Sequence, residues 1–566
     1  MIIGLDVGGT HADVVLLSEK GLLRHTKVTT DPTDLFGTVL TGFEKITDGL
    51  DPSLIRRAVL STTLATNRIV QHRIPDTGMI VTAGPGMDPE SFRTGPCYRV
   101  VKGAIDHRGR EIMPVDPDQV LEAANAFQKE GIRFVGVVGK FSVRNAIHEE
   151  QIGDLIEDRF EKVFLGHRVS GNLNFPRRIS TTFLNASVYP IHKEFYEAVV
   201  RSLNEKGLTV PLRILKPDGG NMRFDASIDH PSQTVLSGPA ASVMGAVAFA
   251  PEDAACLVLD IGGTTTDMAL LVNGAPLLDP MGIQIGDHKT LIRSLDTISI
   301  GIGGDSLVRV VDGIIKIGPD RVGMAMAFGG PEPTPTDAMF LLGIADGGDF
   351  EQARKGIQYV ADELGTDIQD AAQRVFERAC RTILEKADAM VERINAKPVY
   401  TVHELWEGHR LQPNRILVLG GPALWFSKGL AHLTERVVEV VPQWKVANAI
   451  GAGLARTTCE VTLFADTEQE VATAPEEMYM ETISSQYTLK DAVNIALDLL
   501  REKAIARGAN PEHLEMEVVD SMSFNMVRGF YTTGKNIRVK VQIKPGLIHG
   551  YDQMNLRGVD HAEGKP

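Results

Sequence analysis

The chain has 566 residues, of which 43% are hydrophobic and 23% charged, a composition typical of a globular protein with several domains. Its 73 acidic and 58 basic side chains give a formal net charge of −15, which excludes the broad basic surface used for sequence-independent nucleic-acid binding. No window approaches the ~18–20 apolar residues of a membrane-spanning helix. We therefore expect neither a nucleic-acid nor a membrane partner.

Cysteine usage points to a reducing compartment. The four cysteines are scattered without a CxxC pair, at Cys97, Cys256, Cys380 and Cys459. The opening MIIGLDVGGT also lacks the basic start and uninterrupted apolar stretch of a signal peptide. We expect a cytoplasmic protein.

Hydrophobic periodicity predicts alternating strands and helices in an N-terminal lobe, residues 1–180. The expected elements are a strand–turn–strand unit at 1–17, helices at 35–46, 117–130 and 146–160, and strands at 79–82 and 134–138. Residues 181–460 are assigned to a second lobe. Its expected elements are a helix at 178–204 interrupted near Pro190, strands at 212–215 and 415–419, a strand–turn–strand unit at 256–271, and helices at 238–248, 371–394 and 447–454.

The pattern changes after about residue 460. An acidic, loop-like stretch at 468–481 precedes a helix at 489–507 and strands at 516–519 and 537–543. We assign residues 461–566 to a small C-terminal α/β appendage.

An internal repeat is the most informative feature of the sequence. Leu5–Leu17 reads LDVGGTHADVVLL and Leu259–Leu271 reads LDIGGTTTDMALL, and the two are identical at 8 of 13 positions. A repeated unit 254 positions away predicts two similar lobes that face each other.

Each repeat places a carboxylate at the end of a strand, followed by two glycines and a threonine. Glycines let backbone N–H groups approach an anion closely, and Mg²⁺ prefers oxygen ligands. The predicted ligand is therefore a phosphate group together with Mg²⁺. The alternative is a pair of tight hairpin turns, for which Gly-Gly is a common connector. The second copy favours the nucleotide interpretation.

The residues expected to hold the phosphates are Gly8, Gly9, Thr10, Gly262, Gly263, Thr264 and Thr265. We expect Asp6 and Asp260 to bind Mg²⁺ through water; alternatively, each aspartate caps its own turn.

Two DxGGT loops and a later strand that ends in Gly420-Gly421-Pro422 resemble the architecture of actin, the heat-shock chaperone ATPases and sugar kinases. More specifically, the chain resembles the hydantoinase A / 5-oxoprolinase family, which includes subunits of acetone and acetophenone carboxylases. The segments that carry the resemblance, in order, are LDVGGTHAD (5–13), STTLATNRIVQ (61–71), RRISTTFLNASVYP (177–190), LKPDGGNM (215–222), LSGPAASVMGA (236–246), LDIGGTTTDMAL (259–270), GIGGDS (301–306), EPTPTDA (332–338) and VLGGPA (418–423).

The sequence departs from the family pattern at several places. Ser61 and His11 replace the usual residues, GIGGDS carries the additional Asp305, and the appendage after about residue 460 matches nothing in the family pattern. The B-type half of the long oxoprolinases is absent from the sequence. These departures concern the substrate rather than the nucleotide.

The resemblance implies an α/β fold of two actin-like, ribonuclease H-like lobes with an ATP cleft between them. It implies ATP and Mg²⁺ as cofactors, and ATP-dependent hydrolysis of a cyclic amide such as a hydantoin, oxoproline or another lactam through phosphoryl activation of the carbonyl. The alternatives are a small-molecule kinase, a carboxylase subunit or a non-catalytic ATP-binding regulator. The expected partners are a small-molecule substrate, a B-type subunit and further copies of this chain in a homo-oligomer.

The same resemblance assigns the nucleoside side of the site to Gly303, Gly304, Gly420, Gly421 and Pro422. Asp260 is the first catalytic candidate. Asp13 and Asp267 occupy equivalent positions in the two repeats, where each either positions a reacting group or makes a structural hydrogen bond.

Substrate contacts are assigned to Thr63, Asn67, Asp305 and Ser306. For the first two, the alternative is the start of a helix, where threonine is a favoured cap. His11, and His288 beside Asp287, raise the alternative of a transition-metal site, against the commoner surface or packed histidine.

Overall fold

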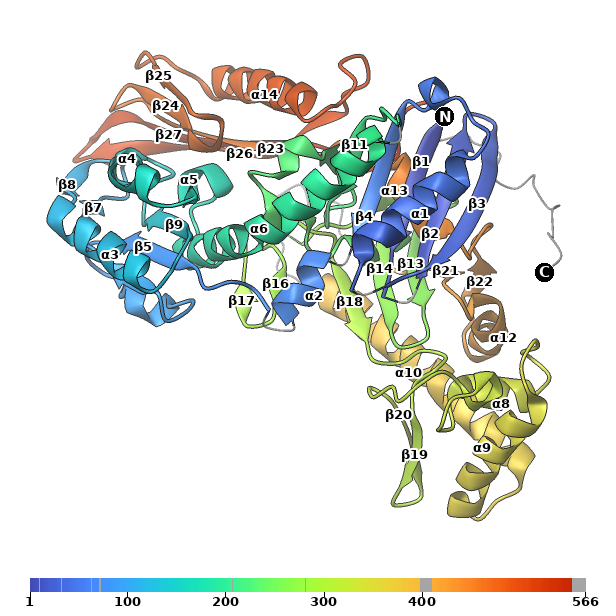
Figure 1. Cartoon of the computed structure of the whole chain (residues 1–566). Coiled ribbons are helices and arrows are strands. Elements are labelled where there is room, and N and C mark those ends of the chain that lie inside the picture. The colour runs from blue at the N-terminus through green and yellow to red at the C-terminus, as the bar shows by residue number, and fades with distance from the viewer. Residues whose placement is uncertain are drawn as a thin grey trace.

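The computed structural model describes residues 1–9, 11–31, 33–62, 64–70, 73–205, 207–279, 281–396 and 410–551 (Figure 1). It has two α/β lobes, each built on a six-stranded sheet, and the strand–loop–strand repeat lies at the centre of both sheets. The expected α/β class and the two strand–turn–strand units are confirmed.

The first sheet has the order β12-β11-β4-β1-β2-β3. Its strands are β1 (Ile2–Val7), β2 (His11–Ser18), β3 (Gly21–Thr29), β4 (Arg57–Thr62), β11 (Leu212–Leu215) and β12 (Asn221–Arg223). Every residue of β1 is buried, as its continuous apolar sequence requires of a central strand covered on both faces. The last two strands lie beyond residue 180, so the division at that residue remains a prediction.

The second sheet repeats this plan with the order β15-β14-β13-β21-β22, and β18 also pairs with β14. Its strands are β13 (Ala255–Ile261), β14 (Thr266–Val272), β15 (Ala275–Pro276), β18 (Thr297–Ile300), β21 (Arg415–Leu419) and β22 (Val437–Val440). In both lobes the first strand of the repeat pairs antiparallel with the second and parallel with a later strand, β4 or β21.

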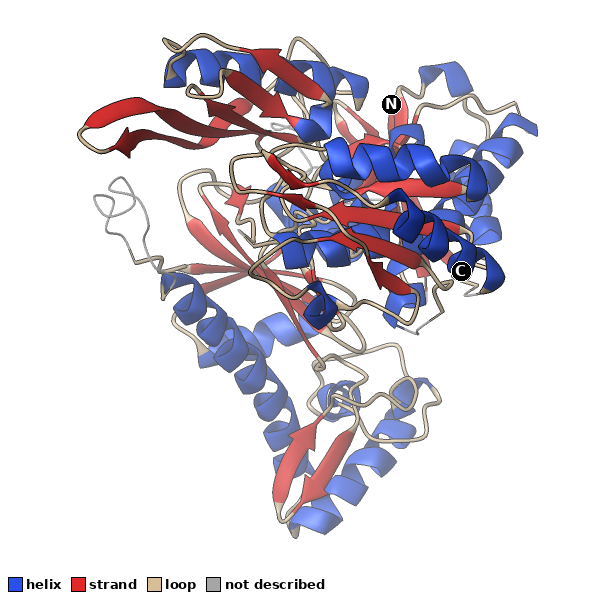
Figure 2. Ribbon diagram, turned by 90° about the vertical axis from the view of Figure 1, so that its left-hand side faces the viewer, coloured by secondary structure: helices blue, strands red, loops and turns tan. Residues whose placement is uncertain are grey.

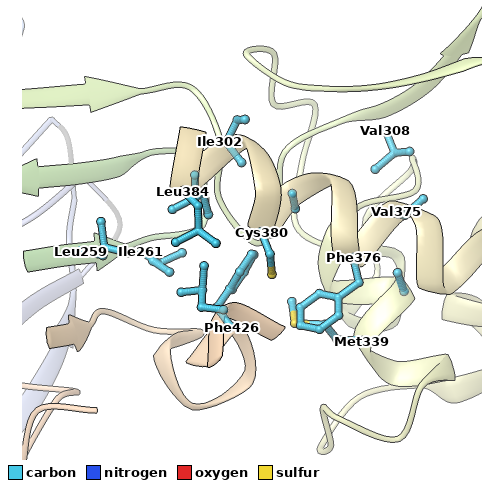
Figure 3. Close-up of a cluster of buried hydrophobic side chains, with 14 of the residues drawn as sticks. Leu259, Ile261, Ile302, Val308, Met339, Val375, Phe376, Cys380, Leu384 and Phe426 are labelled. Atoms are coloured by element: carbon cyan, nitrogen blue, oxygen red, sulfur yellow. The ribbon is translucent and has the colours of Figure 1, made fainter. Parts of the chain in front are cut away.

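Helices cover the outer face of each sheet. Residues of α1 (Leu35–Thr47) and of the second half of α6 (Phe175–Glu205) share one core with β1 in the first lobe. In the second lobe, α10 (Ile368–Asn395) and α12 (Ala423–Leu433) pack on Leu259 and Ile261 of β13 (Figure 3). Alternate residues of the two central strands therefore point outward into these cores.

Two small-residue helices fill the space between the sheets. They are α7 (Ser237–Val247) and α13 (Ala447–Leu454), and they pack tightly against each other. A side chain at Gly4 would collide with the carbonyl of Ala449, and one at Gly245 would collide with Ala447. Glycine at these points lets α13 approach both the first sheet and α7 closely.

Each lobe carries an insertion. The first holds the four-stranded sheet β10-β9-β5-β6, with β5 (Gly78–Thr82), β6 (Tyr98–Val100), β9 (Phe134–Gly139), β10 (Lys162–Leu165), α3 (Pro117–Lys129), α4 (Ile147–Ile156) and α5 (Gly166–Val169). The second holds the hairpin β19 (Val308–Val311) and β20 (Ile314–Ile317), with α8 (Pro335–Leu341) and α9 (Phe350–Leu364) beside the long helix α10 (Figure 2).

The C-terminal domain is a five-stranded antiparallel sheet, β25-β24-β23-β27-β26, packed on one helix. Its elements are β23 (Glu460–Asp466), β24 (Val471–Ala474), β25 (Tyr479–Thr482), α14 (Leu489–Ala506), β26 (Met516–Arg528) and β27 (Tyr531–Ile543). The expected loop at 468–481 is wrong, because Val471–Ala474 is a buried strand that pairs with Tyr479–Thr482. Its short VATA sequence carries too little pattern to be distinguished from a turn.

The expected interruption of the helix near Pro190 is also wrong, because α6 runs unbroken through that residue. Proline removes only one backbone donor, and burial of Tyr189 and His192 on either side holds the helix in place. Among the described helices, none is long and apolar enough to cross a membrane.

Candidate functional site

The two repeated loops have matching geometry. The N–H of Gly8 donates to the carbonyl of His11 at 3.0 Å, and the N–H of Gly262 donates to the carbonyl of Thr265 at 2.9 Å. Across each hairpin the two aspartates are direct partners, Asp6 opposite Asp13 and Asp260 opposite Asp267. The sequence repeat is therefore a structural repeat, and each copy presents two carboxylates at the loop end of its sheet.

Strand alternation explains why Asp6 is buried and Asp260 half-buried. Leu5 and Leu259 point outward into the lobe cores, so the next residue in each strand faces the helices between the sheets. There the amide of Asn448 in α13 donates to Asp6 at 3.4 Å, and the hydroxyl of Ser242 in α7 donates to Asp260. Each loop aspartate is thus held by a different central helix.

Burial is the main influence on the protonation of both aspartates. It raises the pKa of Asp6 to about 6, against hydrogen bonds from Ser61 and Asn448 that lower it. Burial and the neighbouring Asp267 raise the pKa of Asp260 to about 7, and the negative charges of Asp6 and Asp13 contribute to the same increase. Carboxylates of both lobes therefore interact electrostatically, and their shared negative charge favours a cation between them.

The two outer aspartates have local partners. Asp13 forms an ion pair with Lys27 at 3.3 Å, and Asp267 accepts a hydrogen bond from Ser299. Burial raises the pKa of both carboxyls, and Lys27 opposes that effect at Asp13.

The GIGGDS turn supports the second loop. Its Gly304 N–H donates to the Gly262 carbonyl at 2.9 Å, and the N–H of Asp305 donates to the Gly263 carbonyl at 2.6 Å. Ser306 is fully buried, and its hydroxyl accepts the Gly303 N–H at 2.8 Å. These contacts are structural, and the expected substrate contact of Ser306 remains a prediction.

Asp305 differs from its buried neighbour because its carboxylate is partly exposed and pairs with Arg321 at 2.9 Å. Burial raises the pKa of Asp305, and Arg321 opposes the increase.

The turn after β21 meets the same loop. A side chain at Gly420 would collide with the carbonyl of Ile261 and the carboxylate of Asp260, and the φ of +95° also requires glycine there. A side chain at Gly421 would meet no atom within 4 Å. A Cβ at Gly304 would lie 3.5 Å from the ring of Pro422, so the two glycine turns are adjacent beside the second loop.

Two expected site residues, Thr10 and Thr63, lie outside the described residues, as does the side chain of Asn67. The rest of that segment is tied to α7. The hydroxyl of Thr66 accepts the Leu236 N–H at 2.8 Å, and the Ser237 hydroxyl donates to the Thr62 carbonyl at 3.2 Å.

The histidine alternative is not supported by the geometry. His288 packs on the ring of Phe183 at 5.3 Å, and burial lowers its pKa. Within the described ranges, no group of three or more His, Cys, Asp or Glu side chains is arranged to hold a metal ion. Among the described residues, His11 and His288 therefore belong to no such group.

Comparison with known proteins agrees with this geometry. The hydantoinase/oxoprolinase family model matches residues 178–461, and the model of its N-terminal region matches residues 2–160. Two curated relatives are the caprolactamase subunit alpha of Pseudomonas jessenii, 25% identical over 65% of this chain and 60% of the relative, and the acetophenone carboxylase gamma subunit of Aromatoleum aromaticum, 26% identical over 65% of this chain and 58% of the relative. The chain thus spans about 60% of the length of these relatives.

The crystal structure of the ATP-dependent caprolactamase from Pseudomonas jessenii has the same fold. It superposes with a TM-score of 0.71 over 97% of this chain and 88% of that one, at 18% identity. The expected α/β fold with two similar lobes is confirmed.

Proposed function

The chain belongs to the hydantoinase/oxoprolinase family, and from this premise we propose that it hydrolyses a cyclic amide, a hydantoin, oxoproline or other lactam, with ATP as the phosphoryl donor. The observation that carries the proposal is the pair of matching loops whose aspartates, Asp6 and Asp260, influence each other across the two lobes. The name of one relative, an ATP-dependent caprolactamase, supports the same substrate class.

The phosphates of ATP are assigned to the two loops. Backbone N–H groups of glycine pairs form concave anion sites, and a side chain at Gly9 would meet nothing within 4 Å, which leaves room for a ligand. The nucleoside is assigned to the adjacent turns at Gly303–Gly304 and Gly420–Pro422, because Gly421 has the same open surroundings.

The residues present fit Mg²⁺. Asp6 is buried, Asp260 is half-buried, and both have raised pKa values, a setting in which a divalent cation would stabilise the carboxylates. Mg²⁺ is commonly bound by one or two carboxylates, with waters and substrate phosphates as the other ligands. When bound, it would neutralise charge on the β- and γ-phosphates.

The proposed reaction begins when the amide oxygen of the ring attacks the γ-phosphorus and ADP leaves. Water then adds to the activated carbon, and cleavage of the C–N bond opens the ring and leaves an acyl phosphate. A second water hydrolyses the acyl phosphate and releases phosphate. One ATP, one cyclic amide and two waters give ADP, phosphate and the open amino or carbamoyl acid. The loops lower the barrier by positioning the reactants.

Among the side chains, we assign positioning of the attacking water to Asp260, whose carboxylate would accept a hydrogen bond from it. Asp13 and Asp267 position the loop ends. Thr63 and Asn67 are assigned to the substrate, together with Asp305, whose carboxylate is partly exposed beside Arg321.

A panel of hydantoins and lactams, incubated with ATP and Mg²⁺ with and without a B-type subunit, tests the proposal. We expect ADP, phosphate and ring-opened product to form in equal amounts. Mass spectrometry measures the products. If no cyclic amide causes phosphate release, either with or without the B-type subunit, the proposed hydrolase function is wrong. A product that keeps the phosphate identifies a kinase, one that gains CO₂ identifies a carboxylase subunit, and ATP binding without turnover identifies a regulator.

We also propose a B-type partner subunit and assembly of several copies of this chain in the cytoplasm. The relatives carry subunit names, and the β26–β27 hairpin exposes large apolar side chains, including Phe524, Phe530 and Tyr531. The four cysteines are free and buried, which suits a reducing compartment. Light scattering after gel filtration, alone and with the B-type subunit, measures the assembly.

A further inference from the structure

A cavity of about 560 Å³ lies where the first lobe meets the C-terminal domain. Its walls include Ile2 at the start of β1, Arg57 at the start of β4 and Arg213 of β11, together with residues after α14. Asp6 lies at the opposite end of β1, roughly 13 Å away at the ordinary rise of a strand. The cavity is large enough for a small molecule and is separate from the two loops.

Two arginines in this cavity have only neutral partners. Arg57 donates to the carbonyls of Gly453 and Ala455, at 2.7 and 3.0 Å. Arg213 donates to the side chains of Asn221 and Thr457, at 3.1 and 2.7 Å, and to the carbonyl of Gly508. In the part of the chain that the structure describes, neither guanidinium forms an ion pair, and both buried Nε–H groups lack an acceptor.

The remaining charged groups of the cavity do not neutralise these arginines. Arg56 pairs with Glu19 at 3.3 Å, and Arg456 pairs with Glu515 at 2.5 Å. The only other carboxylate among the described lining residues is Glu512, while the rings of His513 and His549 stack at 4.1 Å. With Glu19 included, four arginines against three glutamates leave an excess of one positive charge around the cavity.

This excess of positive charge contrasts with the rest of the molecule and lowers the stability of the fold. The whole chain carries a net charge of −15, yet this cavity is basic. A buried guanidinium without a counterion is destabilising, and an anion that accepts its hydrogen bonds offsets that cost. Burial and the nearby charge of Arg213 lower the pKa of Arg57 to about 9, so the side chain is still mostly charged at neutral pH.

We propose that this cavity is a second ligand site, which binds a small organic anion through phosphate or carboxylate oxygens that accept hydrogen bonds from Arg57 and Arg213. Each guanidinium is planar, and its fork of N–H donors matches the oxygens of a carboxylate or a phosphate. The site is independent of the proposed reaction, because it contains none of the loop residues.

Thermal unfolding of the full chain tests the site with inorganic phosphate and succinate as probes. Saturating Mg²⁺ and ADP are present throughout, so that the nucleotide loops are occupied, and chloride keeps the ionic strength constant. We expect a saturable rise in Tm with at least one probe. Arg213→Gln should weaken the apparent affinity by at least about tenfold, as expected for loss of a charge-assisted hydrogen bond.

Asn510→Asp provides a variant that spares the arginines. Asn510 lines the cavity, and its Oδ1 accepts the Glu512 N–H at 3.2 Å, an interaction that aspartate keeps while adding a negative charge. We expect severalfold weaker binding of the probe and unchanged ADP binding. Asn125→Asp is the matched control, because it makes the same substitution at an exposed position of α3. It should leave the probe's affinity unchanged.

The choice of probe distinguishes the two chemical classes of anion, phosphate esters and carboxylates. A response to phosphate alone identifies a phosphate ester as the ligand class, and a response to succinate alone identifies a carboxylate. No saturable response to either probe, or a response that both Arg213→Gln and Asn510→Asp leave unchanged, overturns the proposal. If Arg213→Gln does not fold, Asn510→Asp decides the question by itself.

Discussion

The two aspartate–glycine loops share a sequence and a hairpin geometry but differ in their support. In the second loop, the carbonyls of Gly262 and Gly263 accept hydrogen bonds from the turn that begins the helical insertion. In the first loop, the carbonyl of Gly8 accepts a hydrogen bond from the Thr30 hydroxyl at 3.0 Å. Backbone fixes the second loop, whereas a side chain holds the first.

The neighbouring strands differ as well. Ser61 of β4 stands beside Asp6, while Leu419 of β21 stands beside Asp260. The Ser61 hydroxyl stabilises the Asp6 carboxylate, and leucine offers no such donor, which agrees with the higher pKa of Asp260. One repeated sequence unit therefore gives two different carboxylates, because residues outside the repeat set their surroundings.

Asp260→Asn tests this difference most directly. We expect kcat for ATP hydrolysis to fall by about 10²–10³-fold, as for loss of one preorganised charged group in an active site. Asp6→Asn should cost less, because Ser61 and Asn448 can bind the amide. Steady-state phosphate release measures both, and Asp253→Asn, exposed just before β13, is the control. Equal losses at both loops would contradict the assigned asymmetry.

Gly420→Ala should have the next largest effect. The added methyl group would collide with Asp260 and would occupy a backbone conformation with a φ of +95°. We expect a loss of about 1–3 kcal/mol in the free energy of unfolding and a clear decrease in ATPase rate. Gly421→Ala, where the methyl group meets nothing within 4 Å, should change stability by less than about 0.5 kcal/mol. Denaturant titration compares the two, and similar losses would remove Gly420 from the support of Asp260.

Local pattern accounts for what the sequence predicted about this site. The strand–loop–strand units are continuous in sequence, and the alternation in Leu5-Asp6 and Leu259-Asp260 follows from strand geometry. Sequence identity between the two units was therefore sufficient to predict their shared structure.

The partners of the aspartates could not be predicted in the same way. Asn448 reaches Asp6 from a helix that is 442 positions away, and no pattern in α13 distinguishes it from a packing residue. Ser242 lies in a family segment, LSGPAASVMGA, but only the packing of α7 against β13 assigns its hydroxyl to Asp260. Likewise, burial of Ser306 depends on how its turn folds onto the second loop.

The raised pKa values predict a pH effect on stability. In the folded state Asp6 and Asp260 bind protons more tightly than in the unfolded state, so the free energy of unfolding falls as pH rises from about 5 to 7. The Tm of the nucleotide-free protein should therefore decrease over this interval. The decrease of Tm with pH should become smaller in Asp260→Asn than in Asp6→Asn. If Tm depends on pH in both variants as it does in the unsubstituted protein, the raised pKa values are contradicted.

Ser242→Ala should give the smallest effect. Its hydroxyl stabilises the Asp260 carboxylate, so its loss should raise the pKa of Asp260 further. The acid limb of the kcat/KM profile should move to higher pH, with a severalfold loss at pH ~6.5 and little change at pH ~8.5, because protonation of Asp260 in the free enzyme would compete with binding of Mg²⁺ and ATP. Ser187→Ala is the matched control, because that serine is also buried in a helix but donates to the Phe183 carbonyl in α6. If kcat/KM falls by the same factor at every pH in both Ser242→Ala and Ser187→Ala, the loss comes from packing and not from protonation of Asp260.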